Sequence, residues 1–162
     1  MAYKGPTVRA AVKFSVMPNT PPRSGGKIVV LVDDEISYID LLEQLLGEHL
    51  ACPVHGFTKP ADALRAMPGL NVGLIVTDYQ MPEMTGLEFI SAVQKINPGI
   101  PVVMITAYHL KFTERELAEV PALKVIVRKP FKWAALANEV VKYWPDPHPP
   151  KVISSGTPFR DI

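Results

Sequence analysis

The chain has 162 residues, a formal net charge of +1 and a hydrophobic fraction of 48%, which suits one globular domain with its own core. No apolar run approaches the length of a membrane span, and the N-terminal region lacks the continuous apolar stretch of a secretory signal. The single cysteine, Cys52, excludes an intrachain disulfide and fits a cytoplasmic protein.

The two ends of the chain differ in composition from its middle. Residues 1–26 contain four prolines and four basic side chains but no acid, which predicts a flexible basic leader. Such a leader could touch an acidic partner or a membrane surface, but a solvated tail is the simpler interpretation. Residues 145–162 contain five prolines and predict a Pro-rich, extended tail. The folded domain is therefore expected at residues 27–144.

Short apolar runs alternate with helical patterns through this domain. Runs rich in β-branched residues predict five strands, at 27–32, 53–57, 72–77, 101–105 and 123–128. Amphipathic spacing and turn residues predict five helices, at 36–48, 59–67, 85–97, 110–119 and 131–144. Thr85 and Glu88 have the spacing of a capping box at the start of the third helix. The alternation predicts an α/β fold, a three-layer sandwich with helices on both faces of a parallel sheet.

Polar side chains follow four of the five strands. Asp33 and Asp34 come after the first strand, Asp78 after the third, Thr106 after the fourth and Lys129 after the fifth. Because the carboxyl ends of parallel strands meet at one edge of a sheet, we expect these side chains to converge. Crowded carboxylates repel one another, and a divalent cation such as Mg²⁺ removes that cost. The pattern predicts an acidic metal site with a lysine beside it, suited to a phosphoryl group.

Each of these residues has a simpler explanation when it is taken alone. Asp33 or Asp34 could cap the helix that follows, Asp78 could be an ordinary turn residue, and Lys129 could be solvated. The histidines show no zinc-ligand spacing. The prediction therefore depends on the whole set of strand-end residues.

The same set carries a family resemblance. Asp33-Asp34, Asp78-x-x-Met81-Pro82, Thr106-Ala107 and Lys129-Pro130-Phe131 resemble the receiver domain of two-component response regulators, over residues 27–144. The resemblance implies a flavodoxin-like, doubly wound sheet of five parallel strands in the order 2-1-3-4-5. It also implies a cis peptide between Lys129 and Pro130. The expected activity is that of a signalling domain that catalyses its own phosphorylation and dephosphorylation, not that of a conventional enzyme.

The resemblance assigns the reacting groups residue by residue. Asp78 is implied as the phosphoacceptor, which takes a phosphoryl group from a phosphohistidine of a sensor histidine kinase or a histidine phosphotransfer protein. Lys129 is implied to pair with the phosphoryl oxygens, and Thr106 to hydrogen-bond one of them after the domain has switched. Each role suits phosphoryl transfer, which depends mostly on positioning and charge neutralisation.

The resemblance also implies Mg²⁺ as the cofactor. Asp34, Asp78 and the backbone carbonyl of Gln80 are implied as direct ligands, and Asp33 as a ligand through water. The carboxylate and carbonyl oxygens of this set are the donors that Mg²⁺ prefers.

One departure from the family concerns the switch. Many receivers have Tyr or Phe three residues before the lysine, where this chain has Ile126. Tyr108 is a hypothetical substitute as the mobile aromatic near the fourth helix, next to Ala107 and Thr106. Gln80 and Tyr108 are also expected to flank the path of water that attacks the acyl phosphate.

The expected output is a switched surface of the fourth helix, fifth strand and fifth helix that binds an unknown downstream protein. A homodimer is a further arrangement that this surface allows. We expect no direct contact with nucleic acid, because no output domain follows Trp144.

Two alternatives stay open. One is a pseudo-receiver that binds partners without phosphorylation, although every reacting residue is retained. The other is an aspartyl-phosphate phosphatase, but such enzymes usually carry a second Asp two residues after the nucleophile, where this chain has Gln80.

Overall fold

The computed structural model describes residues 26–109 and 111–152. Nearly all of the expected leader and the second half of the expected tail therefore lie outside the described residues. Five strands form one sheet: β1 (Ile28–Val32), β2 (Val54–Phe57), β3 (Val72–Asp78), β4 (Val102–Thr106) and β5 (Leu123–Arg128). Their order is β2-β1-β3-β4-β5 and every pair is parallel, which confirms the predicted topology.

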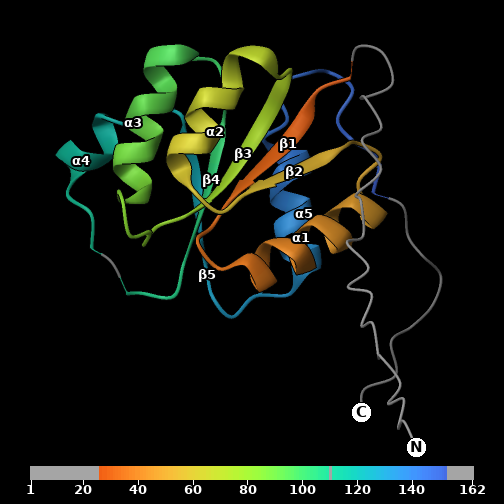
Figure 1. Cartoon of the computed structure of the whole chain (residues 1–162), viewed down its shortest axis with the longest axis horizontal. Coiled ribbons are helices and arrows are strands. Elements are labelled where there is room, and N and C mark those ends of the chain that lie inside the picture. The colour runs from red at the N-terminus through yellow and green to blue at the C-terminus, as the bar shows by residue number, and fades with distance from the viewer. Residues whose placement is uncertain (1–25, 110, 153–162) are drawn as a thin grey trace, which may run out of the picture.

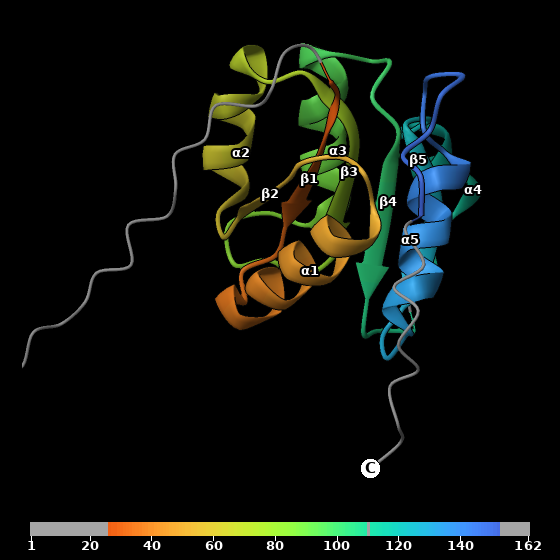
Figure 2. The same cartoon turned by 90° about the vertical axis from the view of Figure 1, so that its right-hand side faces the viewer.

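Helices cover both faces of this sheet. They are α1 (Ile36–His49), α2 (Pro60–Ala66), the 3-10 turn η1 (Met67–Gly69), α3 (Gly86–Ile96), α4 (Glu114–Ala118) and α5 (Trp133–Lys142). Figures 1 and 2 show α2, α3 and α4 on one side of the sheet and α1 with α5 on the other. The predicted three-layer sandwich is therefore confirmed.

Two apolar clusters lie between the sheet and its helices. Alternate residues of β1 divide between them: Val30 packs toward Phe89 of α3, and Leu31 toward Leu46 of α1. All residues of β1, β3 and β4 are buried, since helices cover both of their faces. This double burial explains why the three central strands appear in the sequence as continuous apolar runs.

The fourth helix is shorter than the predicted range 110–119. It covers only Glu114–Ala118, because Thr113 caps it with a complete capping box to Glu116. The fifth helix is also shorter than predicted and begins at Trp133 instead of residue 131. The predicted capping box of Thr85 and Glu88 is confirmed.

The residues just after α5 pack along the amino-terminal edge of the sheet. Asp146 forms an ion pair with Lys27, at 2.9 Å. The amide of Ala51 donates to the carbonyl of Lys151 at 3.2 Å, and Leu50 pairs with Val152 in an antiparallel bridge. Within residues 26–109 and 111–152, no helix is long and apolar enough to cross a membrane.

Candidate phosphoryl-transfer site

Three of the predicted site residues meet at the carboxyl edge of the sheet. The Nζ atom of Lys129, just after β5, lies 2.9 Å from Oδ1 of Asp78 and 3.0 Å from Oδ2 of Asp33. Asp33 is 3% exposed and Asp78 is 7% exposed, so both carboxylates are largely removed from water. The ammonium of Lys129 therefore bridges two buried acids that come from β3 and the turn after β1.

Backbone groups hold the two carboxylates in place. The amide of Glu35 donates to Oδ1 of Asp33 at 2.9 Å, and the amide of Gln80 donates to Oδ2 of Asp78 at 2.7 Å. The Asp33 side chain therefore accepts a hydrogen bond from within its own loop. The alternative that Asp33 or Asp34 caps α1 is wrong, because Glu35 occupies the cap position and α1 has no side-chain cap.

The start of α3 lies directly against Asp78. The amide of Gly86 donates to the carbonyl of Tyr79 at 2.7 Å. A Cβ atom at Gly86 would lie only 2.7 Å from the carbonyl oxygen of Asp78 and 3.0 Å from the sulfur of Met104. This close approach requires glycine at residue 86, and it ties the position of the phosphoacceptor candidate to the cap of α3.

Burial and ion pairing shift the pKa values of the two central groups. Burial raises the pKa of the Asp78 carboxyl, and the hydrogen bond and charge of Lys129 oppose that shift. Burial disfavours the charged form of Lys129, but hydrogen bonds to Asp78 and Asp33 outweigh it and raise the pKa of the ammonium. Lys129 is therefore a cation at neutral pH, placed to neutralise charge at Asp78.

An open cavity of about 440 Å³ gives access to these groups. Its wall consists of Asp33, Asp34, Glu35, Asp78, Gln80, Ala107, Tyr108 and Lys129. Asp34 and Tyr108 are exposed at its rim. Sequence reasoning had named all of these residues except Glu35, and the structure brings them together around one opening.

Thr106 and Ile126 line a different, smaller cavity. It measures about 140 Å³ and is bounded by Thr106, Tyr108, Phe112, Ile126 and Arg128. Thr106 is buried, and its Oγ1 accepts a hydrogen bond from the amide of Tyr108 at 3.0 Å. Tyr108 contributes to both cavities and is 52% exposed. The Thr106 hydroxyl is thus engaged with the loop after β4.

Sequence reasoning missed two aromatic contacts near the site. The ring of Tyr38, on the first turn of α1, lies under the ammonium of Lys129 and packs edge-on against Phe131. The ring of Tyr79, next to Asp78, packs edge-on against Phe112 in the segment before α4. Both tyrosines lie close in sequence to a predicted site acid, but nothing in the sequence indicated which distant side chain either ring meets.

The oxygen donors around the larger cavity suit Mg²⁺ in kind. They include the carboxylates of Asp33, Asp34 and Asp78 and the backbone of Gln80, all hard ligands. Among the residues that the structure describes, however, no three His, Cys, Asp or Glu side chains are gathered closely enough to hold a metal ion. Lys129 instead satisfies one oxygen of Asp33 and one of Asp78. The predicted magnesium site therefore stays a prediction.

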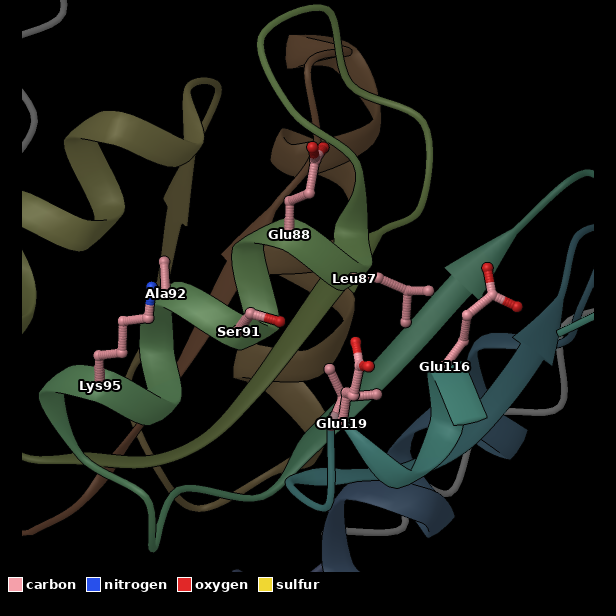
Figure 3. Close-up of a pocket in the computed structure, with 8 residues that line it drawn as sticks. Leu87, Glu88, Ser91, Ala92, Lys95, Glu116 and Glu119 are labelled. Atoms are coloured by element: carbon pink, nitrogen blue, oxygen red, sulfur yellow. The ribbon is translucent and has the colours of Figure 1, made fainter. Parts of the chain in front are cut away.

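A further concavity lies between α3 and α4 and shares no residue with the cavity around Asp78 and Lys129. It measures about 380 Å³, and Figure 3 shows Leu87 of α3 projecting toward α4 within it. The capping glutamates Glu88 and Glu116 both line it, and hydrogen bonds from their threonine partners lower the pKa of each carboxyl. This concavity therefore carries an acidic side chain at the start of α3 and another at the start of α4, the helix that belongs to the expected partner surface.

The cis peptide between Lys129 and Pro130 that the resemblance implied is present. The family model named response regulator receiver domain matches residues 29–141 of this chain. This range contains every residue that lines the cavity of about 440 Å³ around Asp78. The transcriptional regulatory protein ZraR of Salmonella typhimurium (strain LT2) is 30% identical over 121 residues, which are 72% of this chain and 26% of that protein. The chain thus spans about a quarter of the length of this curated relative. ZraR is named as a transcriptional regulatory protein. The expectation that this chain makes no direct contact with nucleic acid is therefore not supported by this relative.

Two solved structures show the same arrangement of elements. The response regulator TrrA of Thermotoga maritima, solved in complex with Mg²⁺ and BeF, is 26% identical with a TM-score of 0.62, covering 73% of this chain and 99% of that one. A CheY-like receiver domain protein of Methanospirillum hungatei JF-1 has a TM-score of 0.63 at 21% identity, covering 73% of this chain and 93% of that one. Together with the match over residues 29–141, these findings show that the chain belongs to the response regulator receiver domain family, a family of signalling domains and not of conventional enzymes.

Proposed function

We propose that this chain is the phosphoacceptor module of a two-component phosphorelay. The observation that carries the proposal is the position of Lys129, whose ammonium bridges Asp33 and Asp78 at the wall of an open cavity. A fixed cation beside a buried carboxylate can neutralise the charge that a phosphoryl group brings. The phosphoryl donor is a phosphohistidine of a sensor histidine kinase or of a histidine phosphotransfer protein.

Asp78 is the nucleophile in this proposal. Its carboxylate oxygen forms the new bond to phosphorus while the bond between phosphorus and the imidazole nitrogen breaks, and the leaving imidazole takes up a proton. The amide of Gln80 donates a hydrogen bond to Oδ2 of Asp78, whereas Oδ1 is paired with Lys129. If Oδ1 attacks phosphorus, the ammonium of Lys129 stays close to the incoming phosphoryl group. Positioning of this kind supplies most of the acceleration in phosphoryl transfer.

Asp34, Asp78 and the carbonyl of Gln80 would hold Mg²⁺, with Asp33 contributing through water. When bound, the ion supplies positive charge next to the phosphoryl oxygens. The residues fit this role by donor type and by their place around one cavity.

The output of the module is a switched surface of α4, β5 and α5. Thr106 would leave its bond to the Tyr108 amide and reach a phosphoryl oxygen on Asp78, and Tyr108 would then be free to move. Ile126 is smaller than the aromatic residue that many receivers carry there, and the cavity beside it leaves space of about 140 Å³.

A phosphorylation-independent binding module is the main alternative. It would need neither the ion pair of Lys129 with Asp78 nor the access that the cavity provides. Labelling with a small phosphodonor such as phosphoramidate, followed by intact-protein mass spectrometry, separates the two functions. We expect the wild type to gain one phosphoryl group with Mg²⁺ and none with EDTA, and Asp78→Asn to gain none. A wild-type protein that stays unlabelled under these conditions would rule out the proposal.

A further inference from the structure

The ammonium of Lys129 has an aromatic partner in addition to its two acids. Its Nζ atom lies 4.1 Å from the centroid of the Tyr38 ring, well within the range of a cation–π contact. Tyr38 comes from the first turn of α1, whereas Lys129 follows β5 at the far side of the site. The ring therefore fixes the ammonium from an element that carries none of the predicted reacting groups.

The Tyr38 ring is itself held in place. Phe131, two residues after Lys129, packs edge-on against it with ring centroids 6.5 Å apart and an interplanar angle of 76°. The backbone amide of Tyr38 donates to the carbonyl of Glu35 at 3.0 Å. Burial raises the pKa of the Tyr38 hydroxyl to about 12, with the charge of Lys129 acting in the opposite direction, so the ring is a neutral phenol at physiological pH. A braced, neutral ring presents a constant face to the ammonium.

The three contacts of Lys129 differ in what the proposed chemistry would do to them. Asp78 would carry an acyl phosphate, and Asp33 would turn toward a hydrated cation. The ring face of Tyr38 has no such second role, because it offers no oxygen ligand to Mg²⁺ and no hydrogen-bond donor to a phosphoryl oxygen. The ring contact is therefore the one that can persist while both carboxylates change partners.

We propose that Tyr38 is a positioning residue for Lys129, whose ring face holds the ammonium at the point where a phosphoryl group on Asp78 arrives. This inference rests on the proposed function and adds a residue to the site, on α1. Lys129 keeps its place over the ring, and its hydrogen bonds pass from Asp33 to the phosphoryl oxygens. Tyr38 touches no reacting atom and acts through Lys129 alone.

Tyr38→Leu and Tyr38→Phe form a matched pair of variants. Leucine fills part of the same apolar space but has no ring face, whereas phenylalanine keeps the face and loses only the hydroxyl. Tyr38→Met, with a longer flexible side chain, replaces the leucine variant if that variant folds poorly. The amide spectrum of each variant checks whether the fold is intact.

The first measurement detects the contact in the resting protein. In a sample with ¹³C-labelled lysine, a ring face above the ammonium shifts the ε-methylene signal of Lys129 upfield, and Lys129→Arg identifies that signal. We expect the shift in wild type and Tyr38→Phe and its loss in Tyr38→Leu. A wild-type signal at the position of a solvated lysine would overturn the inference whatever the protein's function.

The second measurement tests the consequence with beryllofluoride and Mg²⁺, which together mimic the phosphorylated state. We expect Tyr38→Leu to weaken beryllofluoride binding by about three- to tenfold, and Tyr38→Phe to leave it nearly unchanged. In a Lys129→Met background, Tyr38→Leu should have no further effect. If Tyr38→Leu lowered the beryllofluoride affinity of the Lys129→Met protein as much as that of the wild type, Tyr38 would act by packing alone. That result would overturn the positioning role. Absence of binding to the wild type would instead overturn the proposed function, leaving the lysine signal to decide whether the ring contact exists.

Discussion

The hydroxyl of Thr106 accepts a hydrogen bond from the backbone amide of Tyr108, at 3.0 Å. Both residues line the small cavity that also contains Ile126 and Phe112. A side-chain rotation that carries the Thr106 Oγ1 toward a phosphoryl group on Asp78 changes the geometry of this bond. The position of the loop after β4 is therefore coupled to the orientation of Thr106.

Tyr108→Ala should uncouple phosphorylation from the movement of α4. The exposed ring of Tyr108 is the aromatic group that adjoins both cavities, and alanine leaves nothing to move into the smaller one. We expect the amide signals of residues 111–120 to change with beryllofluoride and Mg²⁺ in the wild type and to stay nearly constant in the variant. Tyr108→Phe keeps the ring and should behave like wild type. A full response of the alanine variant would show that Tyr108 is not the switch aromatic.

Gly86→Ala should destabilise the protein by about 1–3 kcal/mol and impair labelling of Asp78. The added Cβ would lie 2.7 Å from the backbone carbonyl of Asp78, so the start of α3 and the end of β3 must shift apart. Urea denaturation measures the stability, and intact-protein mass measures the labelling.

Gly47→Ala is the matched control for this substitution. Its Cβ would meet nothing within 4 Å, and alanine in a helix interior is favoured over glycine by about 0.5–1 kcal/mol. We expect this variant to be slightly more stable than wild type and normally labelled. A Gly86→Ala protein as stable as Gly47→Ala would contradict the close packing of α3 against Asp78.

Asp78→Asn should raise the free energy of unfolding of the metal-free protein at neutral pH. Burial raises the pKa of the Asp78 carboxyl above its ordinary value of 3.8, so the native state binds that proton more tightly than the unfolded chain does. The resulting stability is complete below the ordinary pKa and is lost as the pH rises through the folded pKa. The advantage of the variant therefore grows from acid to neutral pH, within about 1–2 kcal/mol.

Urea denaturation in EDTA at several pH values measures this advantage. A variant that is less stable than wild type at every pH would show the opposite balance, in which the ion pair with Lys129 outweighs the cost of burying the Asp78 carboxylate.

Mg²⁺ should stabilise the wild type by mass action. At a free concentration ten times the Kd, binding to the native state alone adds about 1.4 kcal/mol, which raises the Tm by about 3–6 °C. Asp34→Asn should lose most of this increase, because Asp34 lines the cavity with an exposed carboxylate and is the proposed direct ligand. Asp62→Asn is the control, since Asp62 lies on α2 and pairs with Arg65. An equal Tm increase in Asp34→Asn and wild type would place the ion elsewhere.

The convergence of the strand-end acids and the lysine could be predicted from the sequence, because topology alone brings these residues together. Once five apolar runs are read as parallel strands, Asp78 and Lys129 must lie at one edge of the sheet, whatever the details of packing. The orientation of Thr106 was not predictable in the same way. A strand end fixes where a residue lies, but the local turn decides which cavity its hydroxyl faces.

Two of the misses in the sequence analysis have different physical causes. Thr113 and Glu116 show the same capping-box spacing that was recognised at Thr85, so the start of α4 could have been read from the sequence. The contact between Tyr38 and Lys129 could not have been read from the sequence. Helical periodicity indicates which face of α1 is buried, but not which distant side chain that face meets.

The central claim is that Asp78 itself receives the phosphoryl group, and the most direct test maps the modified residue. The wild-type protein is incubated with Mg²⁺ and phosphoramidate and then treated with borohydride, which reduces an aspartyl phosphate to homoserine. Peptide mass spectrometry then identifies the altered position. We predict homoserine at residue 78 alone, and none when EDTA is present. Homoserine at Asp33 or Asp34, or an unmodified residue 78 in a protein that carries the label, would contradict the account.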